Sequence, residues 1–229
     1  MTSASSTTLP ATFRSGALEL QSPFLLAPLE GVSDVGFRAL CFHNGAGFTW
    51  TEMVRARGLA KHNRATIELV DTFDSTTPTG VQLMVTGPQD LNDAIGVLNE
   101  LASTTHPHFQ NIRSIDLNFG CPSPDVIRIG AGPALLKRRA KLGAIFDALR
   151  SVKLRSERGE LRLKIGSVSA KIRLGLNQQE RDHKVYVPVV EMANDTLDHL
   201  TVHARHAKQR SRDAPSWAAI GEDRVHAKI

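Results

Sequence analysis

The sequence predicts an α/β fold, a (β/α)8 TIM barrel of which about six βα units are present. Two observations carry this prediction. From residue 23 onward, short apolar runs alternate with longer amphipathic stretches, a pattern typical of parallel strands joined by helices. The centres of the apolar runs recur about every 24 to 34 residues, apart from one longer gap, and a complete barrel takes about 250 residues for its eight units.

Six apolar runs are expected to form the strands, and each is only a few residues long. They are FLLAPL (24–29), GFTWTEM (47–53), GVQLMV (80–85), SIDLNF (114–119), SVSAKIRL (167–174) and HLTVHA (199–204).

Helices are expected between these strands at 34–43, 88–102, 133–153 and 181–192, with a short one around 216–222. Pro88 is favourable at a helix start, because the N–H that proline lacks has no partner there. A basic, turn-rich segment, KLRSERGELRLK (153–164), fills the long gap before the fifth strand. It is either a solvated hairpin or helix extension, or an RNA-contacting patch, and charge alone favours the solvated alternative.

Two regions are expected along the chain. Residues 1–22 are predicted to be a flexible N-terminal segment, because 1–12 are rich in Ser and Thr and lack acidic residues. Residues 23–229 are predicted to form an incomplete barrel domain. The sequence ends at Ile229, soon after the sixth unit, so we expect a truncated barrel with open strand edges and no C-terminal helical domain.

Composition excludes several classes of protein. Cys41 and Cys121 are the only cysteines, which excludes a disulfide-rich secreted scaffold and a Cys-based zinc cluster. We therefore expect a reducing, cytoplasmic setting and no metal. No apolar stretch approaches the roughly 20 residues that cross a bilayer. The net charge of +5 permits a polyanionic partner without requiring one.

Polar side chains lie at or near the ends of the expected strands, where TIM barrels gather their catalytic groups. Burying Gln82 or Lys171 without partners would cost several kcal/mol, roughly, and a planar, partly anionic ligand in the barrel mouth would satisfy both. The alternative is that Lys171 and Arg173 reach solvent while Gln82 faces outward between helices. The residues in question are Pro28, Leu29, Glu30, Glu52, Gln82, Asn118, Lys171, Arg173, His203 and Arg205.

The segment Asn118-Phe119-Gly120-Cys121-Pro122 places a thiol in a turn-rich loop that begins at a strand end. Cys41 lies in an expected helix and fits the common case of a small buried hydrophobic residue. The setting of Cys121 favours exposure into the barrel mouth. There it could donate a proton as a thiol or attack as a thiolate.

Seven segments, in order and at compatible spacing, resemble the tRNA-dihydrouridine synthases: LAPLEGVSDVGFR, TEM, VQLM, DLNFGCPSP, GAGPALLK, SAKIRLG and TVHAR. The resemblance runs from about Leu26 to Glu222. It implies a monomeric FMN-containing TIM barrel that binds tRNA and reduces specific uridines to 5,6-dihydrouridine, with NADPH as the reductant. In such an enzyme the cofactor carries the hydride chemistry, and the target base is unstacked to reach it.

The resemblance also implies roles for individual residues. Cys121 is then the general acid, Asn118 helps hold the uracil, and Arg173 and Arg205 are candidates for contacts with the substrate. The residues expected to line or hydrogen-bond the flavin are Pro28, Leu29, Glu30, Gln82, Lys171 and His203.

Two features depart from this family. The strands that would hold the FMN phosphate and a helical tRNA-binding domain have no counterpart before Ile229, and ARHAKQRSRDAPSW differs from the family's usual pattern. Two other functions therefore stay open. One is an FMN barrel that acts on a free pyrimidine, as in dihydroorotate or dihydropyrimidine dehydrogenases, and the other is a non-catalytic RNA-binding remnant.

Overall fold

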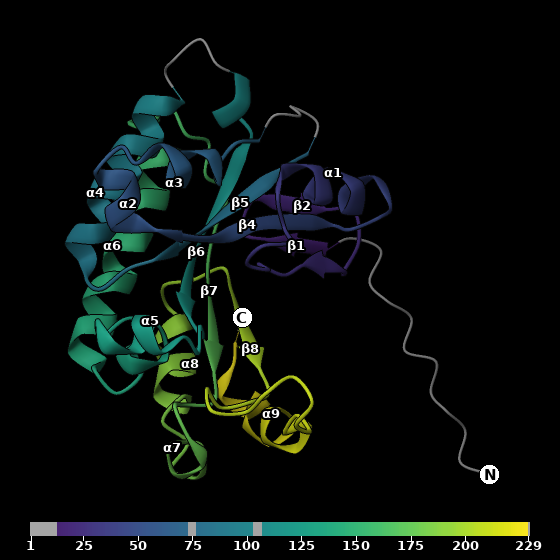
Figure 1. Cartoon of the computed structure of the whole chain (residues 1–229), viewed down its shortest axis with the longest axis vertical. Helices are drawn as coiled ribbons and strands as arrows, with labels where there is room; N and C mark the ends of the chain where they lie inside the picture. Colours follow the sequence, from purple (N-terminus) through teal and green to yellow (C-terminus); the bar gives the residue numbers. More distant parts are fainter. Residues whose placement is uncertain (1–12, 73–76, 103–106, 229) are drawn as a thin grey trace.

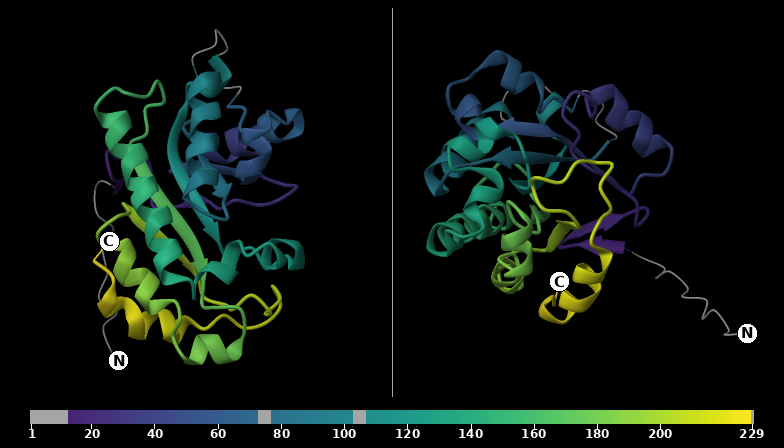
Figure 2. Two further views of the ribbon diagram at one scale, coloured as in Figure 1. Left: turned by 90° about the vertical axis from the view of Figure 1, so that its left-hand side faces the viewer. Right: turned by 60° about the horizontal axis from the view of Figure 1, so that its bottom comes forward.

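A computed structural model of the chain describes residues 13–72, 77–102 and 107–228. Six strands form one parallel sheet in the order β3-β4-β5-β6-β7-β8. The sheet is curled, and helices cover its outer face (Figures 1 and 2). The predicted partial barrel is confirmed. Its strands are β3 (Leu25–Leu26), β4 (Phe48–Arg55), β5 (Thr79–Met84), β6 (Ile112–Phe119), β7 (Ser167–Arg173) and β8 (His199–His203).

The two faces of the sheet differ in chemistry because successive side chains on a strand point to opposite sides. In β6, Leu117 and Phe119 belong to the fully buried apolar core beneath the helices. Asp116 and Asn118 alternate with them and face the concave side. Parallel strands buried on both faces ordinarily read as continuous apolar runs, so this polar concave face stands out.

Helices pack the outer face into a single core. Helices α4 and α6 contact each other, and the rings of Phe119 and Phe146 lie 5.9 Å apart between β6 and α6. The helices of the described residues are α1 (Val35–His43), α2 (Ala56–Ala60), α3 (Arg64–Glu68), α4 (Pro88–Leu101), α5 (Pro124–Arg128), α6 (Arg139–Glu157), α7 (Gln178–Asp182), α8 (Val187–Ala193) and α9 (Trp217–Asp223), with 3-10 turns at Pro107–Phe109, Gly132–Leu135 and Arg224–His226.

Two of the predicted helices are interrupted. The helix expected at 133–153 begins as the 3-10 turn Gly132–Leu135 and restarts as α6, which then continues to Glu157. The helix expected at 181–192 is divided into α7 and α8, because Lys184 has a left-handed φ of 50° that no α-helix accommodates. Helix α8 then starts with a proline in its first turn, a position that proline tolerates.

The N-terminal segment is more ordered than predicted. Residues 1–12 lie outside the described residues, but β1 (Phe13–Ser15) and β2 (Leu18–Leu20) form an antiparallel hairpin. Ser15 Oγ lies 2.6 Å from Ser167 Oγ and 2.6 Å from His199 Nδ1, at the start of β7 and β8. The hairpin is thus fixed by contacts with strands far away in the sequence, which a local pattern cannot reveal.

The basic segment 153–164 lies at the amino-terminal edge of the sheet. Its first residues extend α6, and Lys153 Nζ lies 2.5 Å from Asp198 Oδ1. Leu161 and Leu163 are buried, and Gly166 just beyond donates its N–H to the carbonyl of Arg113 at the start of β6. The segment therefore lies at the edge opposite the strand ends that carry the polar residues.

A search for membrane-crossing helices within the described ranges finds none of sufficient length and apolar character.

The hairpin generates a prediction about stability. Gly16 has φ +56°, and a Cβ there would lie 2.5 Å from the carbonyl oxygen of Gly166. Gly159 has φ +73° with open space around it. Gly159→Ala should cost only the backbone strain of about 1 kcal/mol, whereas Gly16→Ala should cost about 2–4 kcal/mol because the hairpin must also move. Urea denaturation of both variants measures this difference; equal losses would contradict the close packing of the hairpin.

Candidate functional site

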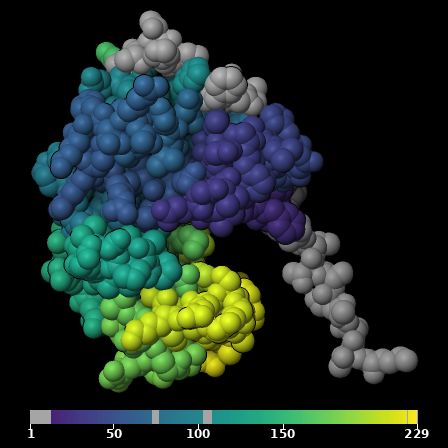
Figure 3. All heavy atoms as spheres, in the orientation of Figure 1, coloured from purple at the N-terminus to yellow at the C-terminus, as the bar shows by residue number. Residues whose placement is uncertain are grey.

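Two adjoining cavities open on the concave face of the sheet. The deeper one, of about 260 Å³, and the outer one, of about 160 Å³, share Pro28 and Lys171 in their walls. Figure 3 shows the surface hollowed between the N-terminal part of the chain, in purple, and the C-terminal part, in yellow. The deeper cavity is lined by Pro23, Leu25, Ala27, Pro28, Trp50, Asp116, Lys171 and Thr201, and the outer one by Pro28, Glu30, Met53, Gln82, Asn118, Gly120, Cys121, Pro122, Lys171 and Arg173.

Most of the residues singled out from the sequence meet in the outer cavity. Leu29, Glu52, His203 and Arg205 do not line it. Leu29 is 42% exposed, because it belongs to the turn that follows β3 and its carbonyl accepts the Ser33 hydroxyl. The residues that do share the cavity are Pro28, Glu30, Gln82, Asn118, Cys121, Lys171 and Arg173.

Gln82 and Asn118 are joined to a buried carboxylate. Gln82 Nε2 donates to Asp116 Oδ2 at 2.7 Å, and Asn118 Nδ2 donates to Gln82 Oε1 at 2.8 Å. The Ser169 hydroxyl donates to Asp116 Oδ1 at 2.6 Å. Gln82 is 1% exposed and faces the cavity, so the alternative that it points outward between helices is wrong.

The charges in this wall oppose their own burial. Burial raises the pKa of Asp116 to about 6, although the hydrogen bonds from Ser169 and Gln82 and the charge of Lys171 act against the rise. Burial lowers the pKa of Lys171, and the Asp116 carboxylate counteracts that shift. Within the described residues, the ammonium group of Lys171 makes no hydrogen bond or ion pair, although its charge and that of Asp116 influence each other. A half-buried ammonium in this position suits a ligand that supplies acceptors.

The Cys121 loop is held from both sides. The N–H groups of Gly120 and Cys121 donate to Asn118 Oδ1 at 3.2 and 2.9 Å. Cys121 also packs against a small apolar cluster that contains Val126. A Cβ on Gly132 would lie 2.9 Å from Val126 and 3.2 Å from the Cys121 carbonyl oxygen, so the small residues of Gly130-Ala131-Gly132 permit this close packing. The loop that presents the thiol is therefore fixed in place.

The turn after β3 is held by neighbouring elements. The N–H of Gly31 donates to Glu52 Oε2 at 2.5 Å, and Gly31 has a left-handed φ of 73°. Arg38 in α1 is buried and donates to the carbonyls of Ser33 and Asp71. These contacts fix the turn that carries Pro28 and Glu30 to the cavity wall.

His203 and Arg205 form a pair beside the cavity. Arg205 Nη1 lies 3.0 Å from His203 Nε2, and because a guanidinium only donates, His203 must accept at Nε2 and carry its proton on Nδ1. Burial lowers the pKa of His203 to about 4, and the positive charges of Arg173, Lys171 and Arg205 add to the effect. The imidazole is therefore neutral at physiological pH.

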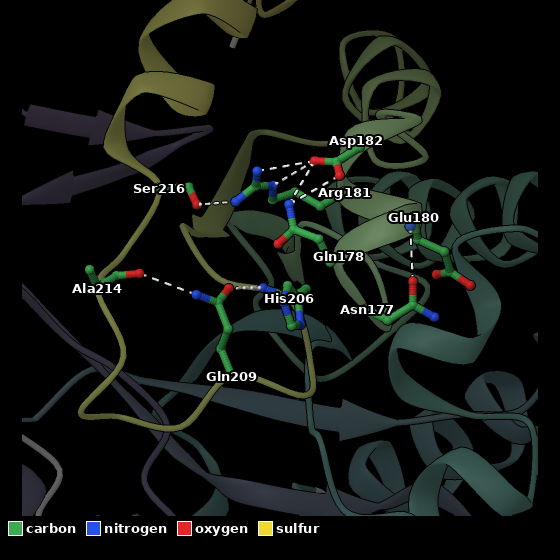
Figure 4. Close-up of polar contacts among 9 residues, drawn as sticks. All are labelled: Asn177, Gln178, Glu180, Arg181, Asp182, His206, Gln209, Ala214 and Ser216. Atoms are coloured by element: carbon green, nitrogen blue, oxygen red, sulfur yellow. Dashed lines mark hydrogen bonds and ion pairs between the residues drawn. The ribbon is translucent and has the colours of Figure 1, made fainter.

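The loop from 204 to 216 is the segment whose sequence departs from the family pattern, and it folds back onto the elements after β7. The N–H of His206 donates to Gln209 Oε1, and Gln209 Nε2 donates to the Ala214 carbonyl (Figure 4). Arg181 in α7 donates to the Ser216 hydroxyl at 3.0 Å. These bonds make the departing sequence a braced loop of the cavity rim.

Asp116, Ser169 and Trp50 belong to the site, although they were not predicted from the sequence. Asp116 carries a usable signal, because it stands two positions before Asn118 and must share its face of the strand. Ser169 stands in the same relation to Lys171. Trp50 carries no such signal, since an indole in an apolar strand is ordinarily predicted to lie in the hydrophobic core. Among the described residues, no group of three or more potential ligands is arranged to hold a metal.

Comparisons with known proteins relate the chain to one family. Residues 25–228 match the model of the family described as Dihydrouridine synthase (Dus). A protein of Mycobacterium tuberculosis is 29% identical over 222 residues, covering 94% of this chain and 52% of its own length. A protein of Rickettsia bellii is 27% identical over 216 residues, covering 93% and 59% respectively. Both carry the name "Probable tRNA-dihydrouridine synthase", and the chain spans somewhat more than half of their length.

The raised pKa of Asp116 generates a prediction. Its ordinary value of 3.8 is raised to about 6 in the fold, so the protonated carboxyl stabilises the native state fully below pH 3.8, and this contribution is lost as the pH rises through 6. Asp116→Asn cannot titrate. The free energy of unfolding of the variant, relative to the wild type, should therefore increase by about 2 kcal/mol between pH 4 and pH 7. Denaturation curves at both pH values test this; a difference independent of pH would mean that Asp116 titrates normally.

Proposed function

Because the chain belongs to the dihydrouridine synthase family, we propose that it reduces specific uridines of tRNA to 5,6-dihydrouridine with FMN as cofactor and NADPH as reductant. The observation that carries the proposal is the meeting of Cys121, Asn118, Gln82 and Lys171 in one cavity on the concave face of the sheet. The family assignment supplies the reaction, and this cavity supplies side chains of the kinds that the reaction needs.

The cavity residues fit a flavin ring. Pro28, Leu25 and Trp50 give the deeper cavity apolar walls that suit a flat ring. Lys171 and the amide of Gln82 provide donors for the carbonyl oxygens and ring nitrogens along its polar edge. Pro28 and Glu30 would border the ring, and the cationic Lys171 would stabilise negative charge on it. FMN, when bound, supplies the hydride for the reduction.

The chain's own contribution to the chemistry is a proton and its placement. Reduction of uracil adds a hydride to one carbon of the C5–C6 double bond and a proton to the other. The thiol of Cys121 would hold that proton at Sγ and deliver it, leaving a thiolate close to the positive charges of Lys171 and Arg173. Solvent then restores the proton to the thiol.

Substrate placement falls to the outer cavity. Asn118 would orient the uracil through an amide hydrogen, and Arg173 lies in the same wall, where it suits a phosphate or a carbonyl oxygen. The net charge of +5 agrees with a polyanionic substrate. His203, neutral beside the cavity, would approach the flavin. Arg205 would hold the imidazole of His203 in place through their hydrogen bond.

The proton-donor role generates a prediction. Cys121→Ala should lower the rate of dihydrouridine formation in unmodified tRNA at least about 100-fold, because removal of a positioned general acid costs a factor of that order. Flavin binding should be unchanged. Cys41→Ala serves as the matched control and should retain full activity, since Cys41 lies in α1 outside both cavities.

The assay is dihydrouridine released from a digest of tRNA after incubation with FMN and NADPH. Turnover of free uracil or orotate, without any tRNA product, would replace the proposal with a free-pyrimidine reductase. Undiminished reduction of tRNA by the Cys121→Ala variant would remove the proposed role of the thiol.

Flavin recognition generates a second prediction. Lys171→Met should weaken FMN binding about tenfold, because it removes one charge-assisted hydrogen bond in a shielded site. Lys141→Met, an exposed lysine on α6, is the control and should bind FMN as the wild type does. Quenching of flavin fluorescence on titration measures both affinities; equal affinities would show that Lys171 does not contact the ring.

A further inference from the structure

We propose that Asp116 is a positioning residue. Its carboxylate determines which group donates and which accepts along a series of hydrogen bonds through Gln82 and Asn118. This hydrogen-bond chain holds the Cys121 loop and turns N–H donors toward the cavity. The inference rests on the proposed function, in which Cys121 is the proton donor, and it extends that function to a residue that does not touch the thiol.

Strand register brings the members of the chain together. Asp116 on β6 is paired with Gln82 on β5 and with Ser169 on β7, so it stands between two side chains that both donate to it. Asn118 follows two residues later on the same face, within reach of Gln82. Asp116 is only 3% exposed, so its oxygens depend on these partners.

The direction of the chain is fixed at both ends. At one end the backbone N–H groups of Gly120 and Cys121 can only donate, so Asn118 must present Oδ1 to them and Nδ2 to Gln82. At the other end an ionised Asp116 can only accept, so Gln82 must present Nε2 to it and Oε1 to Asn118. The two requirements agree, and each amide has a single orientation that satisfies both neighbours.

This direction determines what a ligand meets. The oxygens of both amides already accept hydrogen bonds from within the protein, whereas each amide nitrogen keeps one hydrogen. Lys171 and Arg173 in the same wall are donors only. The wall therefore favours a ligand edge that carries acceptors, such as the carbonyl oxygens of a uracil or a flavin. Without an acceptor at position 116, Gln82 would be free to turn its oxygen toward the ligand.

Reversing the direction of these hydrogen bonds tests the proposal. Asn118→Asp alone places a carboxylate on each side of Gln82. When the Gln82 amide donates to one carboxylate, its oxygen faces the other, so one of the two hydrogen bonds is lost. Adding Asp116→Asn provides a donor at position 116, so the chain can run the opposite way while the carboxylate at position 118 still accepts from the Cys121 loop. Asp116→Asn alone keeps an acceptor for Gln82 and is expected to resemble the wild type.

The readout is alkylation of Cys121 by iodoacetamide in the full chain without flavin or tRNA, followed by mass spectrometry of the labelled peptides. Rate constants are compared on the plateau at high pH, where a shifted thiol pKa has no effect. Cys41, which is partly exposed in α1 and lies outside both cavities, is labelled in the same sample and serves as the internal reference. Because no cofactor or substrate is added, the result stands whether or not tRNA is reduced.

We expect Asn118→Asp to accelerate labelling of Cys121 relative to Cys41 about tenfold, the factor that corresponds to loss of one buried hydrogen bond. The double variant Asn118→Asp/Asp116→Asn should return to within about twofold of the wild type, since it restores every bond of the chain. A double variant as reactive as Asn118→Asp alone would overturn the proposal. If Asn118→Asp does not fold, Asp116→Leu replaces it: an unchanged Cys121 to Cys41 ratio there would equally overturn it.

Discussion

The burial of the Asp116 carboxylate is the constraint on which the rest of the site depends. Two neighbouring strands each provide one donor for it, Gln82 and Ser169, and the register of a parallel sheet places those donors directly beside it. A carboxylate removed from water needs such partners, because an unsatisfied buried acceptor costs several kcal/mol, roughly. The orientation of the amides beyond it follows from that requirement.

The same carboxylate also balances the positive charge of the concave face. Lys171 and Arg173 both project from β7 into the cavity, and burial lowers the pKa of each. The charge of Asp116 acts against that shift at Lys171 and so offsets part of the cost of burying its ammonium group. The wall can therefore be rich in donors and still be compatible with a folded sheet.

Alternation along the strands explains how much of the site is legible in the sequence. Gln82, Asn118 and Lys171 stand out because each interrupts an apolar run, and the parallel sheet then brings them to one face. Asp116 obeys the same period as Asn118, yet its importance lies in its two cross-strand partners, which depend on register. The position of the hairpin at Ser15 also rests on tertiary contacts, and a local pattern carries no trace of them.

The sequence predicts the positions of the strands better than the ends of the helices. The spacing of apolar runs locates all six strands of the parallel sheet, and the strands from β4 to β8 contribute apolar side chains to the core beneath the helices. Helix ends are different, because they depend on single backbone conformations. The division of the fourth predicted helix at Lys184, with its left-handed φ, is such a case. Lysine has no preference for the left-handed conformation, so the sequence gives no signal for a break at this position.

Arg173 and Arg205, both near the cavity, differ in how many of their side-chain N–H donors are still available to a polyanion. Arg205 commits its Nε to the carbonyl of Asp213, Nη2 to that of Ser211 and Nη1 to His203. Its guanidinium therefore braces the rim loop and donates to His203, which makes it a support of the site more than a phosphate ligand. Arg173 lines the cavity and gives one nitrogen, Nη1, to the carbonyl of His206 at 3.2 Å, so within the described residues most of its donors are uncommitted. Of the two arginines that the sequence singles out, the geometry favours Arg173 as the one that meets the substrate.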